Sequence, residues 1–236
     1  MRKNPVLPAV CITLISLATA ALAVPFTIGT ETSTTGNAYP FGTSPSTYIA
    51  RYQQAYASSE FPGEYNITSL TFFDSAHISR TSSNGSFDIF LSTSANAVGS
   101  LSTSFAANVG SDNQFFGSFA ITGGITQVPG NPLIFTGAPF AYDPLNGDLL
   151  MDVWLTVPPT LGGIAMFAAD NSNASIQRIY GTVGTDTTTG GNNPLNYGLV
   201  TRFGDAASVV PVPGGFILVV IGIAASRHIT RSRRVR

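Results

Sequence analysis

The sequence predicts an all-β protein, folded as an antiparallel β-sandwich of the jelly-roll kind. Three observations support this prediction. Short apolar runs recur between turn residues, several runs alternate apolar and polar residues, and no window of 12 or more residues between positions 24 and 205 shows the helical spacing of apolar residues. Nine or ten such runs over about 180 residues are typical of β-sandwiches.

Each predicted strand is an apolar run bounded by turn-forming residues. The runs lie at 25–28, 48–56, 67–73, 86–92, 114–122, 132–135, 149–157, 164–168, 176–182 and 197–203. Within 86–92, Phe87 and Ile89 share one face while Asp88 lies on the other, as expected for a strand buried on one side. The clearest turn is 143–148, Asp-Pro-Leu-Asn-Gly-Asp. Residues 24–46 lack periodicity and are interpreted as a lead-in to the sandwich at 47–208.

Charge is scarce and unevenly distributed. Charged residues make up 10% of the chain, against roughly 25% in an average soluble domain. All 12 acidic residues lie between Glu31 and Asp205, a stretch that holds only four arginines and therefore has a net charge of −8. Such a surface repels phosphate groups, which excludes nucleic acid as a partner.

Residues 1–23 have the three parts of a secretory signal peptide. Arg2 and Lys3 supply the positive start, a mostly apolar stretch follows, and Ala21 and Ala23 provide the small residues that precede cleavage. The apolar stretch is short for a bilayer of about 30 Å, which favours removal over anchoring. We expect the secretion machinery to export the chain and cleavage to occur before Val24.

Residues 209–236 combine three kinds of sequence. The motif Val210-Pro211-Val212-Pro213 comes first, an apolar run at 216–225 follows, and an arginine-rich tail comes last. The arginines of the tail are Arg227, Arg231, Arg233, Arg234 and Arg236. We expect the apolar run to span a membrane as a helix, because the arginines stop translocation and remain on the cytoplasmic side. The two prolines resist helix formation and keep the preceding chain extended.

This terminus resembles the PEP-CTERM sorting signal of bacterial exported proteins, which consists of a short proline-containing motif, an apolar helix and an arginine-rich end. In that family an exosortase of the inner membrane recognises the motif and cleaves there. The matching residues are Val210, Pro211 and Pro213, whereas Val212 stands where the name-giving motif has glutamate. Residues 38–205 are also similar to uncharacterised exported ectodomains that precede such tails. The resemblance implies sorting by an exosortase and no particular activity.

Side chains suited to catalysis are sparse. His77 is the only histidine outside the tail, with Asp74 three residues earlier, and no Gly-x-Ser-x-Gly motif is present. We interpret this neighbourhood as a polar loop after the strand at 67–73. Paired carboxylates would suffice for glycoside hydrolysis. The pairs to consider are Glu60 with Glu64 and Asp148 with Asp152.

Metal ligands are equally limited. Cys11 is the only cysteine and lies within the signal peptide, so that neither an intrachain disulfide nor a thiolate metal site is available. The oxygen-rich segments 143–148 and 170–173 could hold calcium. Neither has the spacing of an EF-hand, and aspartate and asparagine form the same turns without a metal. We expect no cofactor, with calcium as the open alternative.

These observations predict a non-enzymatic exported protein of the cell surface or extracellular matrix. One alternative is a carbohydrate-binding module of the envelope or of exopolysaccharide, in which exposed aromatic side chains stack against sugars. The candidate aromatic residues are Tyr39, Tyr48, Tyr52, Tyr56, Trp154 and Tyr180. A second alternative is a glycoside hydrolase that uses paired carboxylates.

Overall fold

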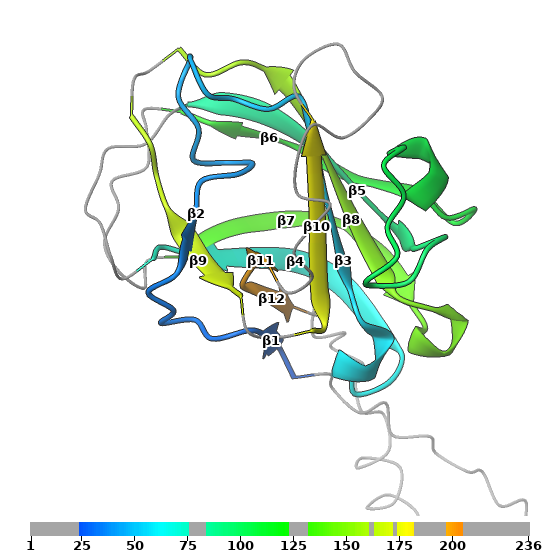
Figure 1. Cartoon of the computed structure of the whole chain (residues 1–236). Coiled ribbons are helices and arrows are strands. Elements are labelled where there is room, and N and C mark those ends of the chain that lie inside the picture. Colours follow the sequence, from blue (N-terminus) through cyan, green and yellow to red (C-terminus); the bar gives the residue numbers. More distant parts are fainter. Residues whose placement is uncertain are drawn as a thin grey trace, which may run out of the picture. The chain divides into compact units, whose positions relative to one another are not determined.

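β-Strands make up most of the regular structure in the part of the chain that the computed structural model describes (Figure 1). This part comprises residues 24–75, 84–122, 132–160, 163–171, 174–181 and 197–204. The prediction of an all-β protein is confirmed. All described residues belong to one compact unit, Ala23–Ala206. The predicted signal peptide, the Val-Pro-Val-Pro motif, the apolar run and the arginine tail lie outside the described residues.

The largest sheet has five strands in the order β10–β3–β8–β5–β6, and all neighbouring strands are antiparallel. The strands are β3 (Arg51–Tyr56), β5 (Gly85–Thr93), β6 (Gln114–Ile121), β8 (Leu149–Val157) and β10 (Ile176–Gly181). The predicted alternation is clearest in β5, where Phe87 and Ile89 are buried while Asp88 and Phe90 are only partly buried. This sheet therefore has an inner face turned toward the core and an opposite, outer face.

A second sheet has four antiparallel strands in the order β1–β12–β4–β7. They are β1 (Phe26–Ile28), β4 (Tyr65–Phe73), β7 (Pro132–Tyr142) and β12 (Thr201–Gly204). β7 extends well beyond the predicted 132–135. Its register against β4 shifts between Ile67 and Ser69, so that the extra residues, including Gly137 and Pro139, form a bulge. Glycine and proline usually mark turns, which is why the predicted strand is too short.

A small third sheet joins three short strands in the order β11–β9–β2. They are β2 (Gly36–Asn37), β9 (Phe167–Asp170) and β11 (Gly198–Leu199). The predicted strand 197–203 is divided between β11 and β12 because the chain changes sheets. Leu199 pairs with Ala169 of β9, whereas Thr201 pairs with Phe72 of β4. The predicted strand 164–168 corresponds to β9 at a later position, and β2 has no predicted counterpart.

Both larger sheets contribute to one hydrophobic core. Tyr56 and Phe87 come from the five-stranded sheet, and Phe72 and Phe203 come from the four-stranded sheet. Phe41 is fully buried, with its ring centroid 5.0 Å from that of Phe72 and 5.2 Å from that of Phe87. The segment 24–46, expected as a lead-in, thus supplies a central core residue. In Figure 1, β4 and β7 run across the direction of β3, β8 and β10.

Three short 3₁₀-helices are the helical elements of the described ranges. They are η1 (Ser58–Glu60), η2 (Ala106–Asn108) and η3 (Pro144–Asn146). η3 forms the predicted turn at 143–148, where Asp143 accepts a hydrogen bond from the backbone N–H of Leu145 at 2.9 Å. Gly147 follows with φ of 131°, a conformation that favours glycine. Among the residues described, no helix is long and apolar enough to cross a membrane.

Candidate functional site

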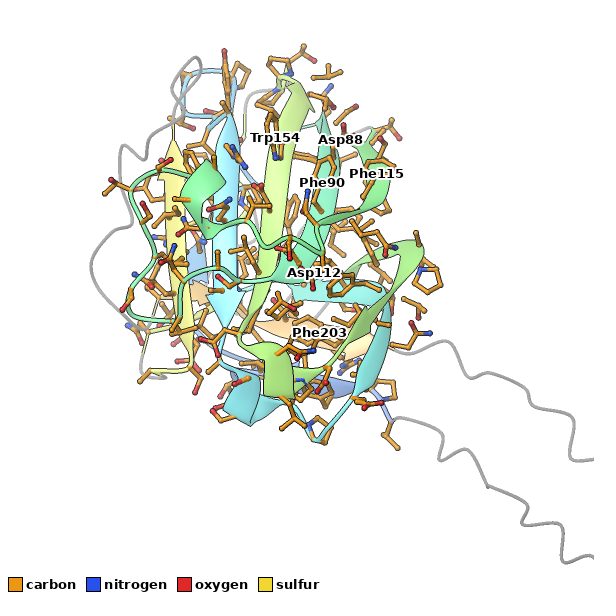
Figure 2. The ribbon with its side chains drawn as sticks, turned by 90° about the vertical axis from the view of Figure 1, so that its right-hand side faces the viewer. Asp88, Phe90, Asp112, Phe115, Trp154 and Phe203 are labelled. Atoms are coloured by element: carbon orange, nitrogen blue, oxygen red, sulfur yellow. The ribbon has the colours of Figure 1, made fainter. Side chains whose placement is uncertain are left out.

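Three aromatic side chains lie side by side on the outer face of the five-stranded sheet (Figure 2). Trp154 on β8 and Phe115 on β6 are 44% and 47% exposed, although large aromatic side chains are mostly buried in folded proteins. The ring of Phe90 on β5 lies between them, with its centroid 6.3 Å from that of Trp154 and 5.4 Å from that of Phe115. We call these three residues the aromatic face.

The alternation of the strands places these rings on the outside. The residues beside them in the sequence, Val153, Ile89 and Phe116, are buried in the core, and successive side chains of a strand point to opposite faces. The strand register then brings the rings together across the sheet, since Phe90 is paired with Phe115. The aromatic face is therefore held on regular strands rather than on a loop.

Polar side chains flank the aromatic face. Asp88 on β5 is paired with Trp154 across the strands, and its Oδ1 accepts a hydrogen bond from the Ser118 hydroxyl on β6 at 2.5 Å. Within the described part of the chain, the second carboxylate oxygen of Asp88 accepts no hydrogen bond. Exposed rings beside a carboxylate and a hydroxyl can provide both apolar stacking and hydrogen bonds to a bound molecule.

A buried ion pair supports Trp154 from the neighbouring strand. Arg51 on β3 donates two hydrogen bonds to Asp152, from Nε to Oδ1 at 3.0 Å and from Nη2 to Oδ2 at 2.5 Å. The two side chains are only 11% and 4% exposed. The guanidinium carbon lies 4.2 Å from the Trp154 ring centroid and 5.0 Å from that of Phe105. The guanidinium thus packs against the indole and supports it. Because the two charges of the pair engage each other, neither is free to bind a ligand.

Residues 94–113, which include η2, cover the part of the outer face formed by β3 and β10. Gln53 on β3 is fully buried, donates a hydrogen bond to the Phe105 carbonyl oxygen and accepts one from Asn108 Nδ2, both at 3.0 Å. Gln177 on β10 is also buried and accepts hydrogen bonds from two backbone N–H groups of this segment. The aromatic face lies in the part of the outer face that this segment leaves open.

The aromatic residues proposed from the sequence differ in accessibility. Tyr52 and Tyr56 are fully buried, and for them the expectation of an exposed stacking ring is wrong. Burial raises the pKa of both phenols, and the Tyr56 hydroxyl forms a hydrogen bond with that of Thr201 at 2.8 Å. Tyr39, Tyr48 and Tyr180 are partly buried. Trp154 is thus the most exposed of the six candidates.

The carboxylates Asp148 and Asp152, considered for hydrolysis, make structural contacts. Asp152 belongs to the buried ion pair. Asp148 accepts a hydrogen bond from the backbone N–H of Ser58 at 2.8 Å through one oxygen, and from that of Val98 at 2.7 Å through the other. These contacts tie two loops to the start of β8 and give both carboxylates a role in the fold.

Three of the other proposed catalytic residues, Glu60, Glu64 and Asp74, lie within the described ranges. Glu60 accepts a hydrogen bond from the Ser175 hydroxyl, while Glu64 is exposed to solvent. Asp74 is buried at the end of β4, and its suggested partner His77 lies outside the described residues. Among the described carboxylates, no hydrogen bond joins Glu60 to Glu64 or Asp148 to Asp152.

Of the two segments considered for calcium, 143–148 forms the turn around η3. Asp143 accepts hydrogen bonds from the Leu145 backbone and, at 3.3 Å, from the Asn146 side chain. In the second segment, Asp170 ends β9, and residues 172 and 173 lie outside the described ranges. The described residues contain no group of three or more His, Cys, Asp or Glu side chains placed to hold a metal ion.

Two residues of the aromatic face, Phe90 and Phe115, are absent from the candidates drawn from the sequence, which considered only tyrosine and tryptophan. Phe90 nevertheless shares the alternation phase of Asp88, and an aromatic residue in the polar phase of a strand is a usable signal of an exposed ring. Phe115 offers no such signal, because Phe116 beside it is equally apolar.

Comparisons with known proteins find no relative. No protein-family model matches the chain. No curated protein and no solved structure matches it either. The function proposed below rests on the sequence and on the aromatic face.

Proposed function

We propose that this chain is a non-enzymatic exported protein of the cell surface or extracellular matrix, processed by an exosortase at its carboxy-terminal end. One observation carries the proposal: a Val-Pro-Val-Pro motif, an apolar run and five arginines follow one another within 209–236. The arginines cannot readily follow the chain through the bilayer, because each guanidinium costs about 2.5–3.5 kcal/mol at its centre. The apolar run would therefore hold the precursor in the inner membrane until cleavage.

The body of the mature chain would be a jelly-roll-like β-sandwich. Two antiparallel sheets that contribute to one hydrophobic core support this architecture. Cleavage by signal peptidase before Val24 and by the exosortase near Pro211 would leave this domain without a membrane anchor of its own.

The sorting proposal is tested by expressing the chain in its host with and without the exosortase and measuring the mass of the mature protein by mass spectrometry. We expect residues after the motif to be missing only in the strain that has the enzyme, and the precursor to stay in the membrane otherwise. Replacing Pro211 and Pro213 by alanine should have the same effect as removing the enzyme. A carboxy terminus that stays intact in both strains contradicts the proposal.

A second candidate function, polysaccharide binding, is favoured by the aromatic face. Rings of Trp154, Phe90 and Phe115 that stay partly exposed on rigid strands can stack against the C–H faces of sugars. Binding of the full chain to immobilised neutral and acidic polysaccharides tests this function. Retention on none of them at millimolar sugar contradicts it.

A further inference from the structure

We infer that the aromatic face binds a single neutral glycan chain of at least two sugar units laid across β8, β5 and β6, and that Asp88 disfavours acidic sugars there. This inference rests on the proposed polysaccharide binding. It assigns that function a place on the molecule, a ligand class and a residue that determines specificity.

The minimum length of the ligand follows from the spacing of the strands. Trp154 and Phe115 lie on β8 and β6, which are separated by β5. Neighbouring strands are about 4.8 Å apart, so that the two outer rings are roughly 10 Å apart across the sheet. One pyranose ring cannot contact both. A monosaccharide would therefore use part of the site, and affinity should rise as a second and third unit are added.

The orientation of the rings favours a single chain over a crystalline polymer. The plane of Phe90 is inclined by 60° to that of Phe115 and by 60° to that of Trp154. Three rings inclined in this way do not form a flat platform, and the flat surface of a crystalline polysaccharide cannot contact all of them. Successive units of a soluble chain can turn about their linkages to meet each ring.

The charge of the site favours a neutral ligand. Asp88 is paired with Trp154, and Arg51, whose guanidinium carbon lies 4.2 Å from the indole centroid, already forms an ion pair with Asp152. The region between Glu31 and Asp205 has a net charge of −8. A chain of uronic acids would bring carboxylates next to Asp88 and into this negative field, whereas the hydroxyls of neutral sugars can donate to the free oxygen of Asp88.

Intrinsic fluorescence provides a direct measurement, because Trp154 is the only tryptophan of the chain. The full chain, kept in a zwitterionic detergent without a sugar headgroup, is titrated with neutral glucan, mannan and galactan oligosaccharides of one to six units, and with oligogalacturonates. For the neutral sugar that binds, we expect at least tenfold tighter binding from one unit to three, then a plateau. Oligogalacturonates should bind at least tenfold more weakly, and crystalline cellulose should not retain the chain.

Variants locate the site. Phe115→Ala should weaken neutral glycan binding at least tenfold, and Trp154→Ala at least as much by calorimetry. Asp88→Asn should reduce the discrimination against oligogalacturonates at least threefold. The matched control is Ile134→Ala, since Ile134 is 56% exposed but lies on β7 of the other large sheet, and it should bind as the wild type does. Thermal unfolding of each variant separates lost binding from lost folding.

The outcomes distinguish this inference from the function on which it rests. If the wild-type chain binds no glycan, polysaccharide binding and this inference fall together. If the wild type binds but Phe115→Ala binds equally well, or oligogalacturonates bind more tightly, the inference alone is wrong. If the wild type binds no sugar and Phe115→Ala converts an oligomer into a monomer in light scattering, the face is a contact between copies of the chain.

Discussion

The two halves of the outer face of the five-stranded sheet differ in how far their side chains are exposed to solvent. In the half under residues 94–113, Gln53 and Gln177 are buried and form hydrogen bonds with this covering segment. In the open half, Trp154 and Phe115 leave nearly half of their surfaces in solvent. The Arg51–Asp152 pair lies at the boundary, with Phe105 on one side and Trp154 on the other.

From this difference we expect the residues that stabilise the fold to be distinct from those that would bind the proposed glycan. A buried polar group must keep its hydrogen-bond partners, because losing one leaves the other desolvated and unpaired. A partly exposed ring loses little when it is truncated, because much of its surface was never removed from water. Substitutions in the covered half should therefore lower the free energy of unfolding, and substitutions in the open half should affect binding.

The largest effect on stability is expected at the boundary. Asp152→Ala leaves the Arg51 guanidinium buried without its partner and should lower the free energy of unfolding by about 3–5 kcal/mol. Urea unfolding measures the loss. The double variant Arg51→Met with Asp152→Leu is the control, and it should recover most of the stability because no charge stays buried. A loss below about 1 kcal/mol for Asp152→Ala would show that Arg51 finds water instead.

Asn108 holds the covering segment onto the sheet, and its loss should have the next largest effect. It is fully buried, donates to Gln53 Oε1 and to the Ser102 carbonyl oxygen at 3.0 Å each, and accepts from the Ser102 backbone N–H at 2.7 Å. Asn108→Ala should lower the free energy of unfolding by about 2–3 kcal/mol. In this variant, the backbone amides of residues 94–113 should exchange their hydrogens faster than those of β4. Equal exchange rates in the two regions would contradict this account.

Truncation in the open half should be milder. Phe115 lies on the edge strand β6, is 47% exposed and contacts the ring of Phe90. Phe115→Ala should therefore lower the free energy of unfolding by about 1 kcal/mol or less. The midpoint of thermal unfolding, compared with that of Ile134→Ala, gives the measurement. A loss as large as that for Asn108→Ala would mean that the open half is also structural.

The exposed ion pair Glu31–Arg202 is the counterpart of the buried one and should contribute least. Burial raises the pKa of Glu31, but hydrogen bonds from Thr27 and Arg202 and the charge of Arg202 outweigh it, so that the pKa is lowered. The stabilisation is therefore present above the unfolded-state pKa and disappears as the pH falls through the lowered value. With side chains 35% and 41% exposed, it should amount to about 0.5 kcal/mol.

The variant Glu31→Gln tests this pH dependence. Its free energy of unfolding should be lower than that of the wild type at pH 7, and the two should converge as the pH falls below the pKa of Glu31. If the difference between the two free energies of unfolding grew as the pH was lowered, the predicted direction of the pKa shift of Glu31 would be wrong.

Local pattern was enough to predict most strands and too little to predict how they join. The runs at 86–92 and 149–157 correspond to β5 and β8, because period-two alternation and flanking turns are properties of neighbouring residues. Phe41 could not be recognised as a core residue, since its segment has no periodicity and its partners lie far away in the sequence. The change of sheet between β11 and β12 likewise depends on pairing with distant strands.

The candidate site shows the same division. Trp154 could be proposed from its residue type, whereas Tyr52 and Tyr56 have the same chemistry and are buried. Alternation tells which residues share a face of a strand, but it does not tell whether that face meets the core, a covering segment or solvent. Residue type and phase therefore identify candidates without ranking them.

By itself, the sequence determined the all-β class, the positions of most strands and the acidic character of the body, because each of these depends on composition or on neighbours along the chain. The tertiary structure alone decided which aromatic rings stay in solvent. Residues 94–113 cover one half of the outer face through contacts such as that between Gln53 and Asn108, and the rings of Trp154, Phe90 and Phe115 meet only when three strands pair in register. Contacts between residues distant in sequence cannot be deduced from local pattern.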